Sequence, residues 1–229
     1  MKIQGLQKMT LLDFPGKVAC TVFLGGCDFR CPFCHNGELL DGSAPAVMDD
    51  QALLRFLKGR QGLLDGVAIT GGEPLLRKDL PDLLRAVREL GFAVKVDTNG
   101  NHPEALEGLL QEKLVDYVAM DIKNSPEKYA LTAGLDSLDL GPIRRSAAML
   151  MEGGIPYEFR TTVVDELHKA ADFEAIGQWI AGARAYFLQP FTDRDSVPFA
   201  GLHAPTGENL EKYASIARAY IPYTAIRGL

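Results

Sequence analysis

The sequence has no long apolar run, and none of its stretches approaches the roughly 20 residues that a membrane-spanning helix requires. Its first ten residues include Lys2, Gln4 and Lys8, so they lack the apolar centre of a secretory signal. Basic residues are fewer than acidic ones, 24 against 30. A nucleic acid is therefore a poor partner, because a phosphate backbone attracts a basic surface. We expect a cytoplasmic protein that binds neither membranes nor nucleic acids.

Cysteines are few, and their distribution is uneven. Of the four, Cys27, Cys31 and Cys34 fall within eight residues, whereas Cys20 lies apart in an apolar run. Clustered cysteines in a reducing compartment are more often metal ligands than disulfide partners. Cys20 is expected to be a small buried residue, as free cysteines often are.

Short apolar segments alternate with helical patterns along the 229 residues, a length that suffices for one well-buried domain. Segments rich in β-branched or aromatic residues predict six strands, at 18–24, 66–70, 93–97, 117–122, 157–163 and 185–188. Helical patterns lie between them at 49–58, 79–90, 103–112, 143–152 and 171–181. The segment 207–227 predicts a last helix and a possible terminal strand.

This alternation predicts parallel strands joined by right-handed crossovers. Six units are too few for a closed eightfold barrel, so we expect an α/β fold with a partial (β/α)6 barrel. A flat doubly wound sheet is the alternative. Either fold places ligands at the carboxyl ends of the strands. We expect one domain over 1–229, with a core at about 18–192.

The loop after the first predicted strand reads GGCDFRCPFCHN, at 25–36. Its Cys-x3-Cys-x2-Cys spacing supplies three thiolates, whereas a fully protein-ligated [4Fe–4S] cluster normally takes four. One iron would then remain open to a small molecule. A zinc site with His35 as the fourth ligand is one alternative, although structural zinc sites usually draw on two separated clusters. A disulfide with one free thiol is the other.

This loop, with Phe33 before Cys34, resembles the signature of the radical S-adenosylmethionine (SAM) superfamily. Further matching motifs accompany successive predicted strands: GGEP at 71–74 and DTNG at 97–100 follow the second and third, DIK at 121–123 ends the fourth, Arg160 lies within the fifth, and LQPF at 188–191 ends the sixth. The resemblance implies an oxidoreductase that holds a [4Fe–4S] cluster on Cys27, Cys31 and Cys34. Such an enzyme cleaves SAM reductively, and the resulting 5′-deoxyadenosyl radical abstracts a hydrogen atom.

The resemblance also implies which residues contact SAM: Phe33, Gly71, Gly72, Glu73, Asp121, Lys123, Arg160 and Leu188. Glu73 would receive the amino group, Lys123 the carboxylate and Asp121 the ribose hydroxyls. Plainer interpretations remain open, namely a Gly-Gly turn between a strand and a helix and an ion pair at a strand end. For Arg160, packing against Glu158 or a neighbouring strand is the plainer interpretation.

Asp97 and Thr98 resemble the part of glycyl-radical activating enzymes that binds a monovalent cation near SAM. The run Asp-Thr-Asn-Gly is also a good turn sequence without any ion. The histidines at 102, 168 and 203 are expected to be solvated.

The runs LLDFPGK at 11–17 and CPFCHN at 31–36 are similar to those of anaerobic ribonucleoside-triphosphate reductase activating proteins. This similarity implies that a glycine of a partner reductase loses a hydrogen atom, with a flavodoxin or ferredoxin as the electron donor. Activation of pyruvate formate-lyase or another glycyl-radical enzyme is the alternative, although this chain has Pro-Phe-Thr at 190–192 where those activases have Pro-Tyr-His. A radical SAM enzyme for a small molecule and a non-catalytic metal-binding protein are the remaining hypotheses.

Overall fold

The computed structural model describes residues 1–228 and divides into two compact units. The first unit consists of Met1–Asp28 and Glu38–Val118, and the second of Phe29–Gly37 and Ala119–Leu229. Within residues 1–228, every helix is too short or too polar to cross a lipid bilayer.

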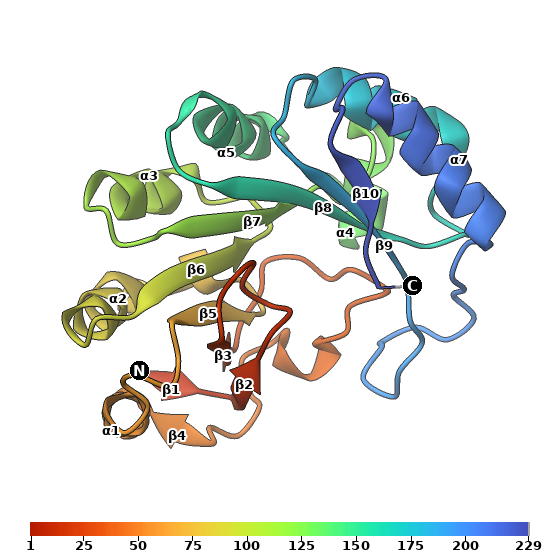
Figure 1. The fold of residues 1–229 in the computed structure, drawn as a ribbon. Coiled ribbons are helices and arrows are strands. Elements are labelled where there is room, and N and C mark those ends of the chain that lie inside the picture. The colour runs from red at the N-terminus through yellow and green to blue at the C-terminus, as the bar shows by residue number, and fades with distance from the viewer. Residues whose placement is uncertain (229) are drawn as a thin grey trace. The chain divides into compact units, whose positions relative to one another are not determined.

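The first unit contains six strands and three α-helices among its described residues (Figure 1). They are β1 (Lys2–Ile3), β2 (Gly5–Thr10), β3 (Ala19–Leu24), β4 (Met48–Asp49), α1 (Asp50–Lys58), β5 (Gly66–Gly71), α2 (Leu80–Glu89), β6 (Ala93–Thr98) and α3 (Pro103–Gln111). The strand order in its main sheet is β2-β3-β5-β6, and β1 pairs with β4. Strands β3, β5 and β6 are parallel, as predicted, whereas β2 is antiparallel to β3. Strand β2 was not predicted, because only one of its six residues is buried and its sequence has no apolar alternation.

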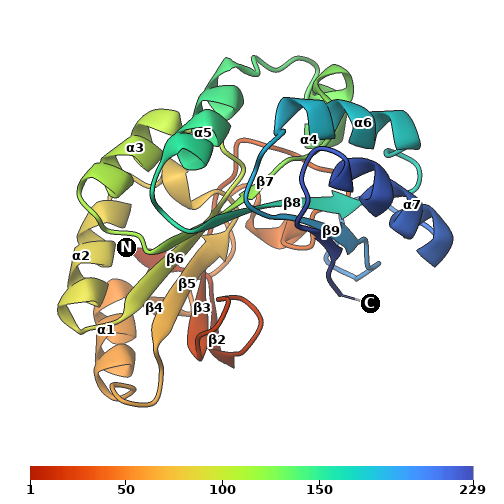
Figure 2. The ribbon, with the colours of Figure 1, turned by 45° about the horizontal axis from the view of Figure 1, so that its top comes forward.

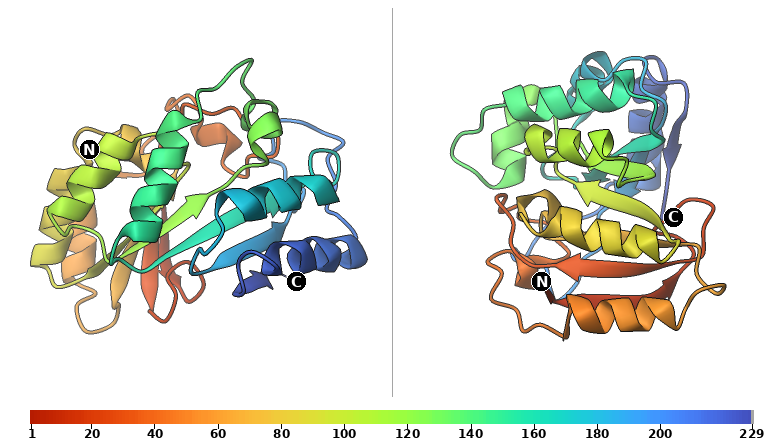
Figure 3. Two further views of the ribbon diagram at one scale, coloured as in Figure 1. Left: turned by 90° about the horizontal axis from the view of Figure 1, so that it is seen from above. Right: turned by 90° about the vertical axis from the view of Figure 1, so that its left-hand side faces the viewer.

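The second unit carries the remaining elements, and Figure 2 shows α5 and α6 above its strands and α7 beside them. They are β7 (Tyr117–Asp121), which starts in the first unit, α4 (Tyr129–Ala133), α5 (Gly141–Glu152), β8 (Tyr157–Val163), α6 (Ala170–Trp179), β9 (Tyr186–Pro190), α7 (Gly207–Arg218) and β10 (Thr224–Ile226). The strand order is β7-β8-β9-β10, and β9 is parallel to both β8 and β10. Helices α6 and α7 lie side by side (Figure 3), joined by stacked rings of Phe173 and Tyr213 at 4.6 Å.

Local sequence explains why these elements form where they do. Helix α2 buries Leu83, Leu84 and Val87 on one face, and the helix packs on β6. Gly91 follows the helix with a φ of 88°, a conformation that glycine adopts without strain. Asp79 stands at the N-cap, but its carboxylate binds Arg77 rather than a backbone N–H of the helix. All six predicted strands and the helix and strand of 207–227 are present.

Candidate active site

The cysteine loop follows β3, and its members are divided between the units. Cys27 belongs to the first unit, where its N–H donates to Leu40 O at 3.0 Å. Cys31 and Cys34 belong to the second unit, in a turn closed by Cys34 N–H and Cys31 O at 3.1 Å. None of the four cysteines is in a disulfide, and Cys20 is fully buried in β3 as expected. The disulfide alternative finds no support in this arrangement.

Burial shifts the pKa of both thiols of the second unit upwards, towards the protonated form. Burial raises the pKa of Cys31 to about 11, although the nearby ammonium of Lys123 opposes this shift. Burial also raises the pKa of Cys34, and Lys123 again opposes it. A soft metal centre would bind such thiols as thiolates and release their protons. Among residues 1–228, no three His, Cys, Asp or Glu side chains are grouped around a position for one metal ion.

The paired glycines after β5 bring two backbone segments of the first unit together. A Cβ on Gly71, whose φ is 126°, would lie 2.1 Å from Leu24 O. A Cβ on Gly72 would lie 2.2 Å from Gly26 O and 3.3 Å from the Cβ of Cys27. No side chain fits either position, because real Cβ atoms do not approach a carbonyl oxygen so closely. The glycines therefore let the segment after β5 lie directly against the start of the cysteine loop.

Glu73 is a buried carboxylate held by donors of its own chain, with only 1% of its surface exposed. Its Oε1 accepts from Leu75 N at 3.0 Å and from Thr98 Oγ1 at 2.9 Å, and its Oε2 accepts from Asn99 N at 2.6 Å. A carboxylate has about four acceptor positions, so these three leave room for one further donor. Burial raises the pKa of Glu73 to about 7, against the three hydrogen bonds that lower it. Glu73 ties the segment after β5 to the turn after β6.

A polar cluster around Asp28 was not predicted. Its Oδ1 accepts from Asn99 Nδ2 at 2.8 Å, and its Oδ2 contacts Asn101 Nδ2 at 2.7 Å and His102 Nε2 at 3.0 Å. Burial alone would raise the pKa of Asp28, but hydrogen bonds from His102, Asn101 and Asn99 lower it to about 2. His102 is 26% exposed and paired with Asp28, so the prediction that it is solvated holds only in part. The available signal was the run of polar residues at 99–102, directly after a strand end.

The two residues expected to hold a monovalent cation lie at the end of β6, and each has a partner from the protein. Asp97 Oδ1 forms an ion pair with Lys95 Nζ. Thr98 Oγ1 donates to Glu73 Oε1 at 2.9 Å and accepts from Gly100 N at 3.0 Å. Sequence reasoning had not singled out Lys95.

In the second unit, three of the expected SAM residues come together at the ends of β7 and β8. Asp121 Oδ2 accepts from Lys123 Nζ at 2.9 Å, and its Oδ1 lies 3.0 Å from both Nε and an Nη atom of Arg160. Although burial would raise it, the charges of Arg160 and Lys123 lower the pKa of Asp121 to about 2. For Lys123, burial acts to lower the pKa, and the charges of Asp121 and Cys31 raise it overall. Two cations thus lie beside the carboxylate of Asp121, and cationic groups of this kind also bind the carboxylate of a ligand.

The backbone around Lys123 is fixed by a buried histidine. His168 is fully buried, and its Nε2 lies 2.9 Å from Lys123 O. Its Nδ1 accepts from Val164 N at 3.1 Å, so the ring is neutral with the proton on Nε2. The prediction that this histidine is solvated was wrong, because the sequence does not show which side of a loop faces the protein interior. Burial lowers the pKa of His168, which keeps the ring neutral.

His35, directly after Cys34, anchors the end of the cysteine loop within the second unit. Its ring stacks on Phe191 at 5.7 Å, and its Nε2 lies 2.8 Å from Thr192 O. The hydroxyl group of Ser196 donates a hydrogen bond to His35 O at 2.7 Å. These contacts give His35 a structural role between the cysteine loop and the segment after β9. Phe33 and Leu188, two further expected SAM residues, are both buried in this unit.

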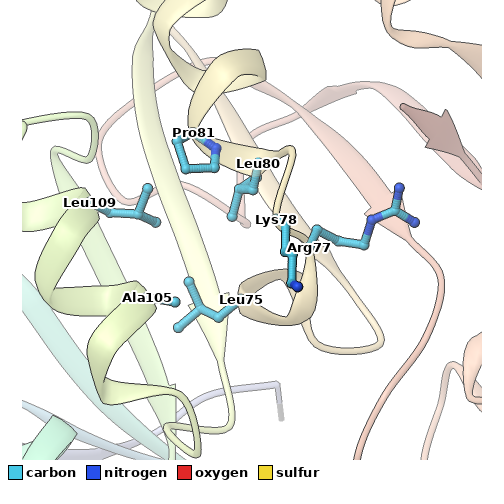
Figure 4. A pocket seen from close by; sticks show the side chains of 7 residues that line it. All are labelled: Leu75, Arg77, Lys78, Leu80, Pro81, Ala105 and Leu109. Atoms are coloured by element: carbon cyan, nitrogen blue, oxygen red, sulfur yellow. The ribbon is translucent and has the colours of Figure 1, made fainter.

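A small hollow of about 150 Å³ lies near the segment after β5, outside this polar network (Figure 4). It is lined by Leu75, Arg77, Lys78, Leu80, Pro81, Ala105 and Leu109. Figure 4 shows the guanidinium of Arg77 pointing away from the apolar side chains. The hollow contains none of the residues expected to bind a cofactor.

The donor set fits an iron–sulfur cluster and SAM. Cys27 in the first unit and Cys31 and Cys34 in the second are soft thiol ligands, and the ammonium of Lys123 favours the thiolate form of Cys31. Gly71 and Gly72 are placed where only backbone fits. The two cations beside Asp121 suit the carboxylate of an amino acid.

Comparison with known proteins identifies the class. A family model described as "Radical SAM superfamily" matches residues 21–173. A protein of Methanocaldococcus jannaschii named "Putative glycyl-radical enzyme activating enzyme" is 31% identical over 99% of this chain and 96% of its own length. The pyruvate formate-lyase-activating enzyme of Clostridium pasteurianum is 33% identical, but the match covers 54% of this chain and 52% of that enzyme.

A solved structure shows the same fold at low sequence identity. Streptococcus suis SuiB bound to S-adenosylmethionine is 14% identical, with a TM-score of 0.67 over 91% of this chain and 52% of that chain. This likeness confirms the predicted fold class, the partial barrel of parallel strands. The chain belongs to the radical SAM superfamily. It is an enzyme, and its cofactors are those of the superfamily, a [4Fe–4S] cluster and SAM.

Proposed function

We propose that this enzyme activates a glycyl-radical enzyme by removing a hydrogen atom from one of its backbone glycines. The observation that carries the proposal is the 31% identity to a relative named for this activity, which extends over 99% of the chain. A match of that extent includes the segments outside the cofactor motifs. When bound, the cluster supplies one electron that cleaves the S–C5′ bond of SAM, and the adenosyl carbon then takes the hydrogen atom from the glycine.

In this proposal the cluster is held by Cys27, Cys31 and Cys34. The ammonium of Lys123, fixed by Asp121 at 2.9 Å, holds the carboxylate of SAM, with Arg160 beside it. Asp121 also accepts from the ribose hydroxyls.

For the first unit we propose that Gly71 and Gly72 admit the ligand to the backbone after β5, and that Glu73 offers its remaining acceptor position to the amino group. Phe33 and Leu188 contribute apolar contacts from the second unit.

We favour anaerobic ribonucleoside-triphosphate reductase as the partner. The support is the similarity of the runs at 11–17 and 31–36 to activating proteins of that reductase. Either a flavodoxin or a ferredoxin would deliver the electron, because the activation consumes one electron for each SAM cleaved.

Pyruvate formate-lyase is the second candidate partner. The Clostridium pasteurianum activating enzyme of that lyase is 33% identical over about half of this chain. The segment at 190–192 speaks against it, because Phe191 and Thr192 stand where those activases have Tyr and His.

Electron paramagnetic resonance distinguishes these partners. The reconstituted enzyme is reduced, given SAM and mixed in separate samples with the anaerobic reductase and with a pyruvate formate-lyase from the same genome. We expect a glycyl-radical doublet on the reductase alone. A doublet on the lyase alone would reverse our choice of partner, and 5′-deoxyadenosine without a doublet on either would refute both. Cys31→Ala should give no doublet, and Cys20→Ala, a matched cysteine outside the loop, should behave as wild type.

A further inference from the structure

Lys95 is a lysine in the interior of the first unit. It lies in β6, in register with Ala68 of β5, and only 1% of its side chain is exposed. An ammonium group loses its hydration when it is buried, and the loss is compensated only by an opposite charge or by hydrogen bonds. Lysine is therefore rarely found at such a position unless it has an anionic partner.

The partner is Asp97, two residues further along the same strand. Side chains two residues apart point to the same face of a strand, which brings Lys95 Nζ against Asp97 Oδ1. The carboxylate is itself largely enclosed, with 17% of the side chain exposed. The two residues thus form an ion pair that is mostly shielded from water.

Thr98, the other residue expected to hold a cation, is engaged in a different way. Its hydroxyl hydrogen is donated to Glu73 Oε1, and one of its lone pairs receives Gly100 N–H. The hydroxyl therefore serves to connect the turn after β6 to Glu73. The arrangement does not fit a monovalent metal ion bound by Asp97 and Thr98, because the carboxylate already faces a positive charge.

We propose that the ammonium group of Lys95 is the resident cation at the end of β6, and that the enzyme binds SAM without a monovalent metal ion at Asp97 and Thr98. An ammonium group and a potassium ion carry the same charge, and both are attracted to carboxylate oxygens. The lysine, however, is covalently attached and present at every salt composition. Neither the stability of the fold nor its affinity for SAM should then follow the potassium concentration.

Thermal unfolding of the cluster-free protein tests this proposal without SAM or any partner. Wild type and Lys95→Met are titrated with potassium chloride, and tetramethylammonium chloride keeps the ionic strength constant. Wild type should show the same melting temperature in both salts. Lys95→Met leaves Asp97 without its cation and opens space beside it. Its melting temperature should rise by about 3–6 °C at a potassium concentration about ten times the dissociation constant.

Three control variants make the test specific. Lys95→Arg retains a cation and should be as insensitive to potassium as wild type. Lys95→Met combined with Asp97→Asn removes the carboxylate as well, so its response to potassium should disappear. Lys128→Met removes the lysine from a second ion pair, which Lys128 forms with Asp172. The side chain of this lysine is 40% exposed. Water replaces that ammonium, and no potassium response is expected.

The same salt series is then applied to SAM binding by the reconstituted enzyme, measured by titration calorimetry. This measurement rests on the radical SAM assignment, whereas the unfolding series does not, so failure of the glycyl-radical activity leaves the unfolding result intact. Wild-type affinity should change by less than about twofold with potassium. A potassium-specific gain in stability or affinity in wild type would overturn the proposal, as would a Lys95→Met variant that ignores potassium. If Lys95→Met does not fold, Lys95→Gln takes its place with the same expected outcome.

Discussion

Two carboxylates at strand ends, Glu73 in the first unit and Asp121 in the second, are held in opposite ways. Glu73 is enclosed by neutral donors, two backbone N–H groups and one hydroxyl. Asp121 is held between the cations Lys123 and Arg160. Burial raises the pKa of Glu73 to about 7, whereas the two cations lower the pKa of Asp121 to about 2. The charge of the partners, rather than the number of hydrogen bonds, decides the protonation state.

The two kinds of partner suit Glu73 and Asp121 to different roles. Neutral donors fix the position of Glu73 and join the loops after β5 and β6, so this carboxylate organises the backbone. Lys123 and Arg160 instead place two cations beside Asp121, and cations of this kind suit an anionic ligand group. The predictions below test this division, from the largest expected effect to the smallest.

Replacing the proposed cluster ligands one at a time should give the largest effects. Cys27→Ala in the first unit and Cys31→Ala in the second should each abolish cluster binding, because a cubane already short of one protein ligand cannot lose another. The visible absorption of the anaerobically reconstituted protein measures this loss. Cys20→Ala should retain the absorption, since that thiol is buried in β3. Loss of the absorption in Cys20→Ala, or its retention in Cys27→Ala, would show that the ligands are misassigned.

Removing each carboxylate charge should expose the difference in their partners. Asp121→Asn leaves Lys123 and Arg160 without their anion. We expect a loss of about 2–3 kcal/mol in the free energy of unfolding, less than for a fully buried pair because Asp121 is 31% exposed. Glu73→Gln leaves one buried donor without an acceptor and should lose about 1–2 kcal/mol. Chemical denaturation of the cluster-free variants gives both values.

An exposed aspartate provides the control for these two variants. Asp82 pairs with Arg85 on the surface with 83% of its side chain exposed, and Asp82→Asn should change the free energy of unfolding by less than about 0.5 kcal/mol. A larger loss in Glu73→Gln than in Asp121→Asn would contradict the comparison of neutral and charged partners.

The two carboxylates should also respond to pH in opposite directions. The pKa of Glu73 is raised in the folded state from 4.5 to about 7, so its contribution to stability is full below 4.5 and is lost as the pH rises towards 7. The pKa of Asp121 is lowered from 3.8 to about 2, so its contribution is present above 3.8 and is lost as the pH falls towards 2. Between about pH 5 and about pH 8, wild type should lose up to about 3 kcal/mol more than Glu73→Gln.

Denaturant unfolding of wild type and Glu73→Gln across that pH range measures the difference. The comparison cancels the titration of other groups, which both proteins share. Parallel pH profiles would mean that Glu73 is already ionised in the folded protein, and that its three donors outweigh burial.

The smallest effect is expected at the pair of His102 and Asp28, since both side chains are partly exposed. The hydrogen bond to Asp28 raises the pKa of His102, against burial. The stabilisation is therefore present below pH 6.5 and is lost as the pH rises through the folded-state pKa. His102→Gln should lose about 0.5–1 kcal/mol in mildly acidic solution and less in alkaline solution. An equal loss at both pH values would show that the contact does not depend on the charge of the ring.

Local features of the sequence predicted much of the fold. Six buried strands were recognisable because apolar and β-branched residues gather in short runs, and Gly91 marked the end of α2. Strand β2 escaped recognition because its stability comes from pairing with β3 rather than from an apolar pattern of its own. The cysteine motif was recognisable for a similar reason, since its ligands lie within eight residues and their spacing alone suggests a metal centre.

The chain's sequence by itself determined the cysteine loop, the two glycines after β5 and the membership of the superfamily, because each depends on residues that are neighbours along the chain. Only the tertiary structure decided the partners of the charged groups. Lys95 is buried against Asp97, Asp28 meets His102, and His168 lies beneath Lys123. The latter two contacts join residues more than forty positions apart. Burial determines how much each of the three contacts contributes to stability. Charge and hydration depend on the surroundings in space, which no local pattern of residues records.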